Sequence, residues 1–509
     1  MVIGIDLGTT YSVAAYVDKN GIAQVITNAE GEETTPSVVL VDGDIARVGK
    51  NAKQRAASFF HKICRCAKVN MGNRVIVLKD AEHEYSPEAI SGLILKKIIQ
   101  DSEKRLGQKI DGAVVTVPTY FDNTKRTATR HALESIVLED GRRVSLVGII
   151  DEPKAAALDY CYQSNKEDGK ILVYDFGGGT FDATLLEVNG NEINILAEGE
   201  EHEAGGAYFD EFITNYVMDE VLKEYNINLR EDKYSQVREE ILCDAETCKI
   251  ELSLNEESSI FVRCPQGSMD ITVTRDAFND LIENMVYRTI IVIEDMLDKK
   301  DIKPEEIDKV LLVGGSSQIP YVRQQLKDMF HKDLSEVVDP NKAVAYGAAI
   351  WADMHKNKEK EKENKLVLSD VTSHAIGLIR MEQSNAQNKI NDILIPPNTP
   401  IPAEKVAAYE TAWDNQRYIR LQITEGLSTQ VEFVKVISDT EVEIPKDINL
   451  KRGTEVRIRF YMNENHLLEV YLEIPSIELN KKYEINRGGN LSEEEMRELS
   501  GLIVSKKIR

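Results

Sequence analysis

The sequence has no long apolar run, because no stretch of 18 consecutive residues is apolar. A helix that crosses a membrane needs about that length of apolar sequence. The first residues, Met1-Val2-Ile3-Gly4-Ile5, enter an apolar strand at once, without the basic residues and apolar segment of a secretory leader. We therefore predict a cytoplasmic protein without a membrane-spanning helix.

Cysteine is scarce and makes no disulfide framework. The six cysteines are Cys64, Cys66, Cys161, Cys243, Cys248 and Cys264. Cys64 and Cys66 form a Cys-x-Cys pair, but no second pair follows at the spacing of a zinc site. Idle or buried thiols are therefore favoured over metal binding.

Positive charge is also in deficit. The net charge is −24, while hydrophobic residues make up 42% and charged residues 29% of the chain, as in ordinary globular proteins. An acidic surface repels phosphate backbones and anionic lipids. We expect neither nucleic acid nor a membrane as a partner.

The pattern of residues changes once along the chain. The first 350 or so residues alternate short apolar runs with helical periodicity, such as Ser86–Arg105, which predicts α/β layers. His355–Lys365 (HKNKEKEKENK) has no apolar residue, and alternating strands broken by turn residues follow from Asp370. We predict an α/β domain over 1–354, a connector and linker over 355–369, a β-sandwich over 370–490 and a helix over 491–509. Leu366-Val367-Leu368 in the linker is interpreted either as a first strand of the next domain or as a segment that docks between domains.

The last segment has the signals of an amphipathic helix. Ser492 and Glu495 have the spacing of a capping box. The apolar face consists of Leu491, Met496, Leu499 and Ile503. A membrane-surface helix is the alternative that we favour less, because three acidic residues stand in its first turn. We expect this helix to lie on the β-rich domain.

Two glycine-rich turns repeat one arrangement. Asp6-Leu7-Gly8-Thr9-Thr10 follows an apolar strand and opens another, and Asp175-Phe176-Gly177-Gly178-Gly179-Thr180-Phe181-Asp182 does the same. Bare backbone and hydroxyl groups can donate to phosphate oxygens, and the aspartates can hold Mg²⁺ through water. Two copies imply a duplicated fold in which facing hairpins bind a triphosphate.

Further glycine pairs fit the rest of a nucleotide. Gly314-Gly315 follows the apolar run Val310–Val313 and precedes a helix, so a nucleoside could lie flat on the backbone there. Gly205-Gly206 is a weaker signal of the same kind. Glu246 and Lys249 share a helix face, where a solvated ion pair is the plainer interpretation.

Ordered motifs make the sequence resemble the DnaK-type seventy-kilodalton heat-shock chaperone family. These motifs are GIDLGTT, NAEGEETTPS, VTVPTYF, DEPKAAAL, VYDFGGGTFD, VLLVGGSSQIP and VDPNKAVAYGAAI. The short stretch after Lys68 and the segment IRFYMNENHLLEV look most like the HscC branch. The resemblance implies an α/β, duplicated actin-like (ribonuclease H-like) two-lobed ATPase domain, followed by an all-β sandwich that binds peptide.

The resemblance also implies site residues and cofactors. ATP or ADP would bind with Mg²⁺, with allowance for K⁺, and Asp6 and Asp175 would hold the metal through water. Catalytic roles would fall to Lys68, Glu152, Asp175, Thr180, Asp6 and Asp182. The nucleotide would contact Gly8, Thr9, Thr10, Tyr11, Gly177, Gly178, Gly179, Gly205, Gly206, Glu246, Lys249, Ser253, Gly314, Gly315 and Ser317.

The implied partners are polypeptides. Unfolded or extended chains would bind in a cleft lined by Leu378, Met381, Ala412 and Ile419, although apolar strand residues are more often core. A J-domain co-chaperone and a nucleotide-exchange factor would assist, and the linker would couple the two domains. The chain stops at Arg509, inside the region where relatives build a helical lid, so we expect a short C-terminal helix and no full lid.

Three positions depart from the family pattern. Lys154 stands where the family has Thr, Gly148 replaces an arginine that helps engage J-domain proteins, and Ser369 replaces a linker leucine. These departures put coupling and J-protein stimulation in question, but not ATP hydrolysis. Alternatives on the same actin-like fold are a sugar or acetate kinase, a filament-forming ATPase, and a nucleotide-sensing regulator that has lost its peptide site.

Overall fold

The computed structural model describes most of the chain and divides it into two compact units. The described residues are 1–163, 168–190, 192–265, 267–334, 337–356, 367–372, 374–382, 388–397, 399–445, 448–463, 468–484 and 491–509. Unit 1 comprises Met1–Thr119, Thr129–Leu366 and Leu491–Arg509, and unit 2 comprises Tyr120–Ala128 and Val367–Asn490. Most of the predicted connector, 357–366, lies outside the described residues.

The first half of unit 1 is built on a sheet with the strand order β11-β10-β1-β2-β3, and β4 also pairs with β2. The strands are β1 (Val2–Asp6), β2 (Tyr11–Val17), β3 (Ala23–Val25), β4 (Thr35–Pro36), β10 (Gly112–Val117) and β11 (Ser145–Asp151). The associated helices are α1 (Lys50–Lys53), α2 (Pro87–Leu106) and α4 (Glu152–Gln163). Helix α3 (Asn123–Glu134) is divided between the units, because its residues up to Ala128 are grouped with unit 2. All six residues of β10 are buried, as expected of a central parallel strand.

Local signals explain the bounds of α2. The Ser86 hydroxyl accepts a hydrogen bond from Ala89 N at 3.3 Å, and Pro87 occupies the first helical position. Gly107 ends the helix at φ 63°, and its N–H donates to Glu103 O at 2.9 Å. The sequence predicts this helix to within a residue at each end.

The second half of unit 1 repeats the pairing pattern of the first. Its sheet includes the order β17-β12-β13-β14. The strands are β12 (Gly169–Phe176), β13 (Phe181–Asn189), β14 (Glu192–Glu201) and β17 (Lys309–Val313). β1 pairs antiparallel with β2 and parallel with β10, and β12 pairs antiparallel with β13 and parallel with β17. The duplication expected from the two aspartate-glycine turns is therefore present in the strand order.

Five helices and a hairpin also lie in this part of the chain. Four of them are α5 (Gly206–Tyr225), α6 (Ser235–Leu252), α7 (Arg275–Lys299) and α8 (Pro320–Phe330), and the hairpin is β15 (Glu257–Cys264) with β16 (Gly267–Thr274). The fifth, α9 (Ala343–Lys356), follows them in the chain but packs on α4 and on strands β1 and β2 of the first half. Helices α4 and α9 pack closely, because a Cβ at Gly347 would lie 1.7 Å from Ala155 O. Small residues in α9 thus serve close helix packing. The predicted start of the connector, at residue 355, is two residues too early, because α9 continues through His355 to Lys356.

Unit 2 contains a sandwich of two four-stranded antiparallel sheets, with the orders β20-β19-β23-β24 and β22-β25-β26-β27. The strands are β19 (Ile376–Met381), β20 (Lys389–Ile395), β22 (Ala403–Glu410), β23 (Tyr418–Glu425), β24 (Lys435–Glu443), β25 (Glu455–Met462), β26 (Leu468–Ile474) and β27 (Leu479–Glu484). One apolar core fills the sandwich, with Phe460, Val470 and Leu472 fully buried. β18 (Val367–Val371) pairs with β21 (Pro400–Ile401), so the described part of the linker segment is a strand.

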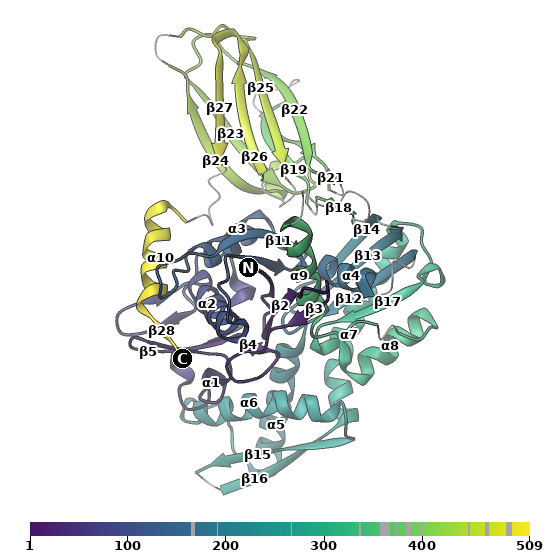
Figure 1. Ribbon diagram of the computed structural model, residues 1–509. Coiled ribbons are helices and arrows are strands. Elements are labelled where there is room, and N and C mark those ends of the chain that lie inside the picture. The colour runs from purple at the N-terminus through teal and green to yellow at the C-terminus, as the bar shows by residue number, and fades with distance from the viewer. Residues whose placement is uncertain are drawn as a thin grey trace. The chain divides into compact units, whose positions relative to one another are not determined.

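The C-terminal helix is where the sequence-based expectation is wrong. Helix α10 (Glu493–Ser505) has the predicted capping box at Ser492, but it belongs to unit 1 and packs beside α2 (Figure 1). Ile503 and Leu499 join the core around α2, where a Cβ on Gly92 would lie 2.5 Å from Ile503 Cδ1. Amphipathicity predicts that a helix has an apolar partner but does not say which one.

Backbone pairing also attaches the residues that follow α10 to unit 1. Strand β28 (Lys507–Ile508) pairs in parallel with β6 (Ile45–Val48), in the sheet order β28-β6-β5-β7 with β5 (Val38–Asp42) and β7 (Ile63–Arg65). The buried Lys96 ammonium donates to Ile503 O at 2.9 Å and to Lys506 O at 3.2 Å. The larger segment of unit 2, Val367–Asn490, therefore lies in the chain between two segments of unit 1.

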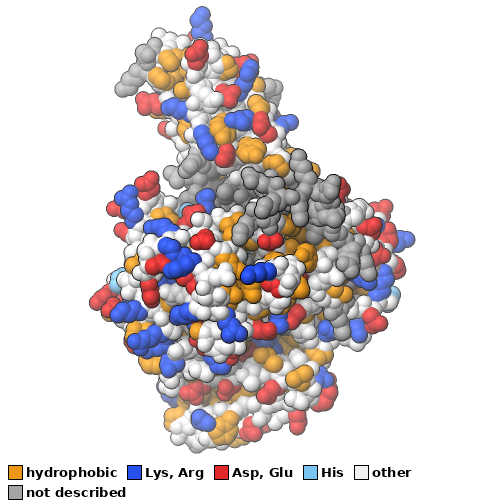
Figure 2. Space-filling model, viewed as in Figure 1, with side chains coloured by type: hydrophobic (Ala, Val, Ile, Leu, Met, Phe, Trp, Pro, Cys, Tyr) orange, Lys and Arg blue, Asp and Glu red, His pale blue; other side chains and the backbone are white. Residues whose placement is uncertain are grey.

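Within the described ranges, no helix is long and apolar enough to cross a membrane. On the face of the molecule shown in Figure 2, acidic and basic side chains are interspersed.

Candidate functional site

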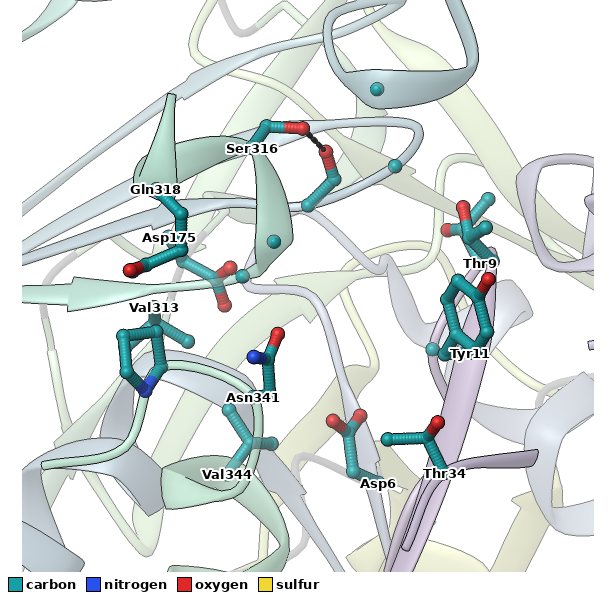
Figure 3. Close-up of a pocket in the computed structure, with 18 of the residues that line it drawn as sticks. Asp6, Thr9, Tyr11, Thr34, Asp175, Val313, Ser316, Gln318, Asn341 and Val344 are labelled. Carbon is teal, nitrogen blue, oxygen red and sulfur yellow. Dashed lines mark hydrogen bonds between the residues drawn. The ribbon is translucent and has the colours of Figure 1, made fainter. Parts of the chain in front are cut away.

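One large cavity of about 550 Å³ lies inside unit 1, between its two halves. Figure 3 shows Asp6, Thr9 and Tyr11 across this cavity from Asp175, Val313 and Ser316. Residues predicted from the sequence that line it are Asp6, Gly8, Thr9, Thr10, Tyr11, Lys68, Glu152, Asp175, Gly177, Gly178, Thr180, Gly206, Glu246, Lys249, Ser253, Gly314 and Gly315. The folded chain therefore brings both predicted turns and the third glycine pair to one place.

The two glycine-rich turns touch each other. A Cβ added to Gly178 would lie 1.8 Å from Thr10 Oγ1, so only glycine lets the hairpins approach this closely. Thr10 Oγ1 and Asp182 Oδ1 are buried without a hydrogen-bond partner in the described part of the chain. Buried polar atoms of this kind suit a polar ligand, and a phosphate group fits the Thr10 hydroxyl.

Two buried aspartates, Asp6 and Asp175, line the cavity, and a third, Asp182, is buried at the second glycine-rich turn without lining it. Burial, followed by the charge of Glu152, raises the pKa of Asp6 to about 7. Burial and the same glutamate raise the pKa of Asp175, and burial with the Asp175 charge raises that of Asp182. Lys68 opposes all three shifts. This excess of buried negative charge fits a divalent cation.

Among the described residues, no three His, Cys, Asp or Glu side chains are grouped to bind a metal ion directly. Cys64 and Cys66 are not joined in a disulfide, and burial raises the pKa of Cys66 to about 11. The magnesium hypothesis for Asp6 and Asp175 already assumes bridging water.

Lys68 and Glu152 meet at the inner end of the cavity. Lys68 lies on the short 3₁₀ helix Ala67–Asn70 and is only 5% exposed, and its ammonium contacts the Glu152 carboxylate. Glu152 is the first residue of α4, directly after β11. An ammonium and a carboxylate so placed can orient a water molecule and compensate charge on a phosphoryl group.

A hydrogen-bonded group of three side chains lies at another part of the cavity wall. Tyr11 donates from its hydroxyl to Glu246 Oε1 at 2.6 Å, and Lys53 lies 2.6 Å from both that hydroxyl and Glu246 Oε2. Burial raises the pKa of Tyr11 to about 12, so the phenol stays a donor. Nearby, Lys249 donates to Gly206 O at 2.8 Å and pairs with Asp210 at 2.7 Å. These contacts offer polar groups of both signs to a sugar.

Four predicted residues do not line the cavity. They are Gly179, Gly205, Asp182 and Ser317. Gly205 instead caps the N-terminus of α5 with φ 144°, a conformation that favours glycine. Ser317 is fully buried and donates to Gly314 O at 2.7 Å, whereas the neighbouring Ser316 lines the cavity and donates to Gly177 O at 2.7 Å. Because the two serines are neighbours in the chain, the sequence alone does not show which of them lines the cavity.

Sequence reasoning missed several lining residues. They are Val13, Thr34, Ile250, Leu254, Val313, Ser316, Gln318, Ile319, Pro340, Asn341 and Val344. Asn341 and Val344 line the same cavity as Asp6, and Figure 3 labels all three. Both belong to the segment VDPNKAVAYGAAI, so the signal was present as a motif, but no single residue in it stood out chemically.

Comparison with known proteins identifies this arrangement. The profile of the Hsp70 protein family matches residues 2–504. The chain belongs to the Hsp70 family. It is 36% identical over 434 residues to chaperone protein DnaK of Thermotoga neapolitana, which covers 84% of this chain and 70% of that protein. The DnaK of Thermosipho melanesiensis is 36% identical over 433 residues, with the same coverage.

Membership of the Hsp70 family settles the class of activity. The protein is an ATPase and an ATP-dependent chaperone. The small-molecule kinase and filament alternatives are not favoured. The assignment to the HscC branch stays a prediction.

The predicted peptide-binding residues of this Hsp70 occupy different environments in the sandwich. Leu378 is 4% exposed and belongs to the core, while Ile419 packs partly against it. Met381 is 43% exposed at the end of β19, and Ala412 is exposed in the turn before β23. β19 pairs with β23 over Ile376–Leu378, so the stretch that ends at Met381 lies outside this ladder.

Proposed function

We propose that the cavity binds Mg²⁺-ATP with its phosphates between the two glycine-rich hairpins. The contact between Gly178 and Thr10 carries this proposal, because it brings backbone and hydroxyl donors from both halves of unit 1 to one point. Gly314 and Gly315 would support the nucleoside, and Glu246 and Lys249 would bind the ribose. The raised pKa values of the aspartates support a cation beside the phosphates.

Hydrolysis would depend on Lys68 and Glu152. Glu152 would orient the attacking water, and the Lys68 ammonium would stabilise negative charge on the γ-phosphate. Mg²⁺ supplies charge neutralisation at the phosphate oxygens. Asp6 and Asp175 would hold its water shell, Asp182 would support them from behind, and K⁺ as a further cation stays a prediction.

The sandwich would bind an extended apolar segment of an unfolded polypeptide. Beyond Leu378 and Ile423 the strands β19 and β23 continue outside their mutual ladder, and Met381 and Ile419 lie at that end. Backbone groups there can pair with an extended chain, while an exposed apolar side chain selects aliphatic residues. Leu378 is part of the core, so it would support the peptide site from inside the sandwich and would not contact the peptide as an exposed side chain.

Co-chaperones are the least supported partners. Gly148 is buried in β11, opposite Val114, so it offers no side chain to a J-domain protein. Lys154 is buried as well. We expect weak stimulation by J-domain proteins, and an exchange factor stays a prediction.

Fluorescence anisotropy of a labelled, aliphatic-rich peptide tests the sandwich assignment. We expect tighter binding with ADP than with ATP, and loss of binding in Met381→Glu. Val406→Glu is the matched control, because Val406 is 48% exposed on the other sheet. Unchanged peptide affinity in Met381→Glu would move the peptide site elsewhere.

A further inference from the structure

Lys154 is a buried cation in the first turn of α4, two residues after Glu152. It is the third residue of α4, and both Lys154 and Asp151, the last residue of β11, are 1% exposed. The Lys154 ammonium contacts the Asp151 carboxylate and lies 3.7 Å from Glu198 Oε1. Glu198 is on β14, and its side chain is 10% exposed. One ammonium therefore serves two buried carboxylates.

This ion pair joins the two halves of unit 1. Asp151 is the last residue of β11 in the sheet of the first half, and Lys154 follows that strand in the first turn of α4. Glu198, in contrast, is on β14 in the sheet of the second half. Glu198 pairs with Thr184 on β13, two residues after Asp182. The contact thus connects the start of the Glu152 helix to the hairpin that carries the second aspartate-glycine turn.

We propose that Lys154 is a positioning residue for ATP hydrolysis. By binding Asp151 and Glu198 together, it fixes the first turn of α4 against β14 and so sets the Glu152 carboxylate against Lys68. The inference rests on the proposed role of Glu152. It is specific to this chain, because the family pattern has threonine at this position.

Electrostatics explain why the effect reaches Glu152. Removal of one member of a buried ion pair leaves uncompensated charge in a low-dielectric interior. Without the ammonium, Asp151 and Glu198 repel each other across the two halves. Lys154 is two residues from Glu152 in the first turn of α4, so the proposal predicts that this repulsion displaces the Glu152 carboxylate. Displacement of a catalytic group by about 1 Å costs on the order of 100-fold in rate.

Lys154→Met tests the proposal, because methionine keeps the length of the side chain and removes its charge. We expect kcat for ATP hydrolysis to fall at least about tenfold, with the Kd for ATP within about threefold of wild type. Adding Glu198→Gln removes the repulsion and should restore part of the lost kcat. Lys170→Met is the matched control: its ion pair with Glu306 at 3.3 Å is partly exposed, and kcat should not change.

The outcomes separate three accounts. Wild-type kcat in Lys154→Met, with a lowered melting temperature only, would overturn the proposal and leave a structural role. Should Lys154→Met not fold, Glu198→Gln alone carries the test, because it breaks the bridge between the halves while Lys154 still neutralises Asp151. A wild-type kcat in Glu198→Gln would overturn the proposal equally. Glu152→Gln run in parallel tests the foundation: if it retains wild-type kcat, the proposed role of Glu152 fails. If Glu152→Gln is slow while Lys154→Met is not, only the positioning role fails.

Discussion

The Lys68 ammonium contacts the Glu152 carboxylate inside the cavity, although the two residues lie 84 positions apart in the chain. Neither residue stands out in the sequence alone. Together they place opposite charges where the two glycine-rich hairpins converge, which is what hydrolysis of a bound triphosphate requires.

Lys68→Ala should spare ATP binding and slow hydrolysis. A lysine about 4 Å from a phosphate oxygen contributes roughly 4 kcal/mol at an effective dielectric near 20, before desolvation is subtracted. A net loss of about 3 kcal/mol would lower kcat by about 100-fold. Single-turnover hydrolysis, with a separate measurement of ATP affinity, checks this prediction. Lys62→Ala is the control, because the Lys62 side chain is partly exposed and pairs with Asp42 at 2.8 Å. Near-wild-type turnover in Lys68→Ala would remove Lys68 from the mechanism.

Gly314→Ala and Gly315→Ala should differ sharply. Gly314 has φ 79°, and an added Cβ would lie 2.4 Å from Phe176 O, whereas the nearest atom to a Cβ on Gly315 is Asn341 Oδ1 at 3.9 Å. Backbone strain and overpacking of this kind cost about 1–3 kcal/mol each. Denaturant unfolding without nucleotide should show a clear loss of stability for Gly314→Ala and little for Gly315→Ala. Equal stabilities would contradict the close approach of this turn to Phe176.

Ile503→Ala should destabilise unit 1. Ile503 is fully buried beside Gly92, and replacing a buried isoleucine by alanine costs about 2–5 kcal/mol. Val504→Ala on the same helix is the control, because Val504 is 49% exposed. Thermal unfolding in the presence of ATP, which reports on the nucleotide-binding unit, separates the two. If Ile503→Ala behaves like Val504→Ala, helix α10 does not belong to the core of that unit.

Acid should destabilise the protein partly through His131. Burial, followed by the charge of Arg130, lowers the pKa of His131 to about 4, against an ordinary value of 6.5. A histidine with a depressed pKa contributes stability above pH 6.5 that is lost as the pH falls towards 4. Each pH unit in this window costs up to about 1.4 kcal/mol. Urea unfolding at pH 7.5 and pH 5 measures how much free energy of unfolding is lost on acidification, and this loss should be smaller in His131→Gln than in the wild type. An equal loss in both proteins would mean that the imidazole is not buried as a neutral group.

The sequence predicts the hairpins of this site better than it predicts their surroundings. Asp6 and Asp175 repeat one turn with its glycines, so local chemistry reveals them. Asn341 and Val344 reach the cavity only through tertiary packing and have no local signature. The capping box at Ser492 predicts the start of α10 correctly, but the partner of its apolar face depends on the surface around Gly92, which no local pattern encodes. Lys154 was visible only as a departure from a family motif.

Steady-state ATPase activity with Mg²⁺, measured with and without a saturating extended aliphatic peptide, tests the central claim most directly. The account predicts a slow basal rate that rises when peptide is added, because both domains function and are coupled. A rate that does not respond to peptide would contradict the coupling of the sandwich to the nucleotide site. The absence of any Mg²⁺-dependent hydrolysis would contradict the assignment of the cavity itself.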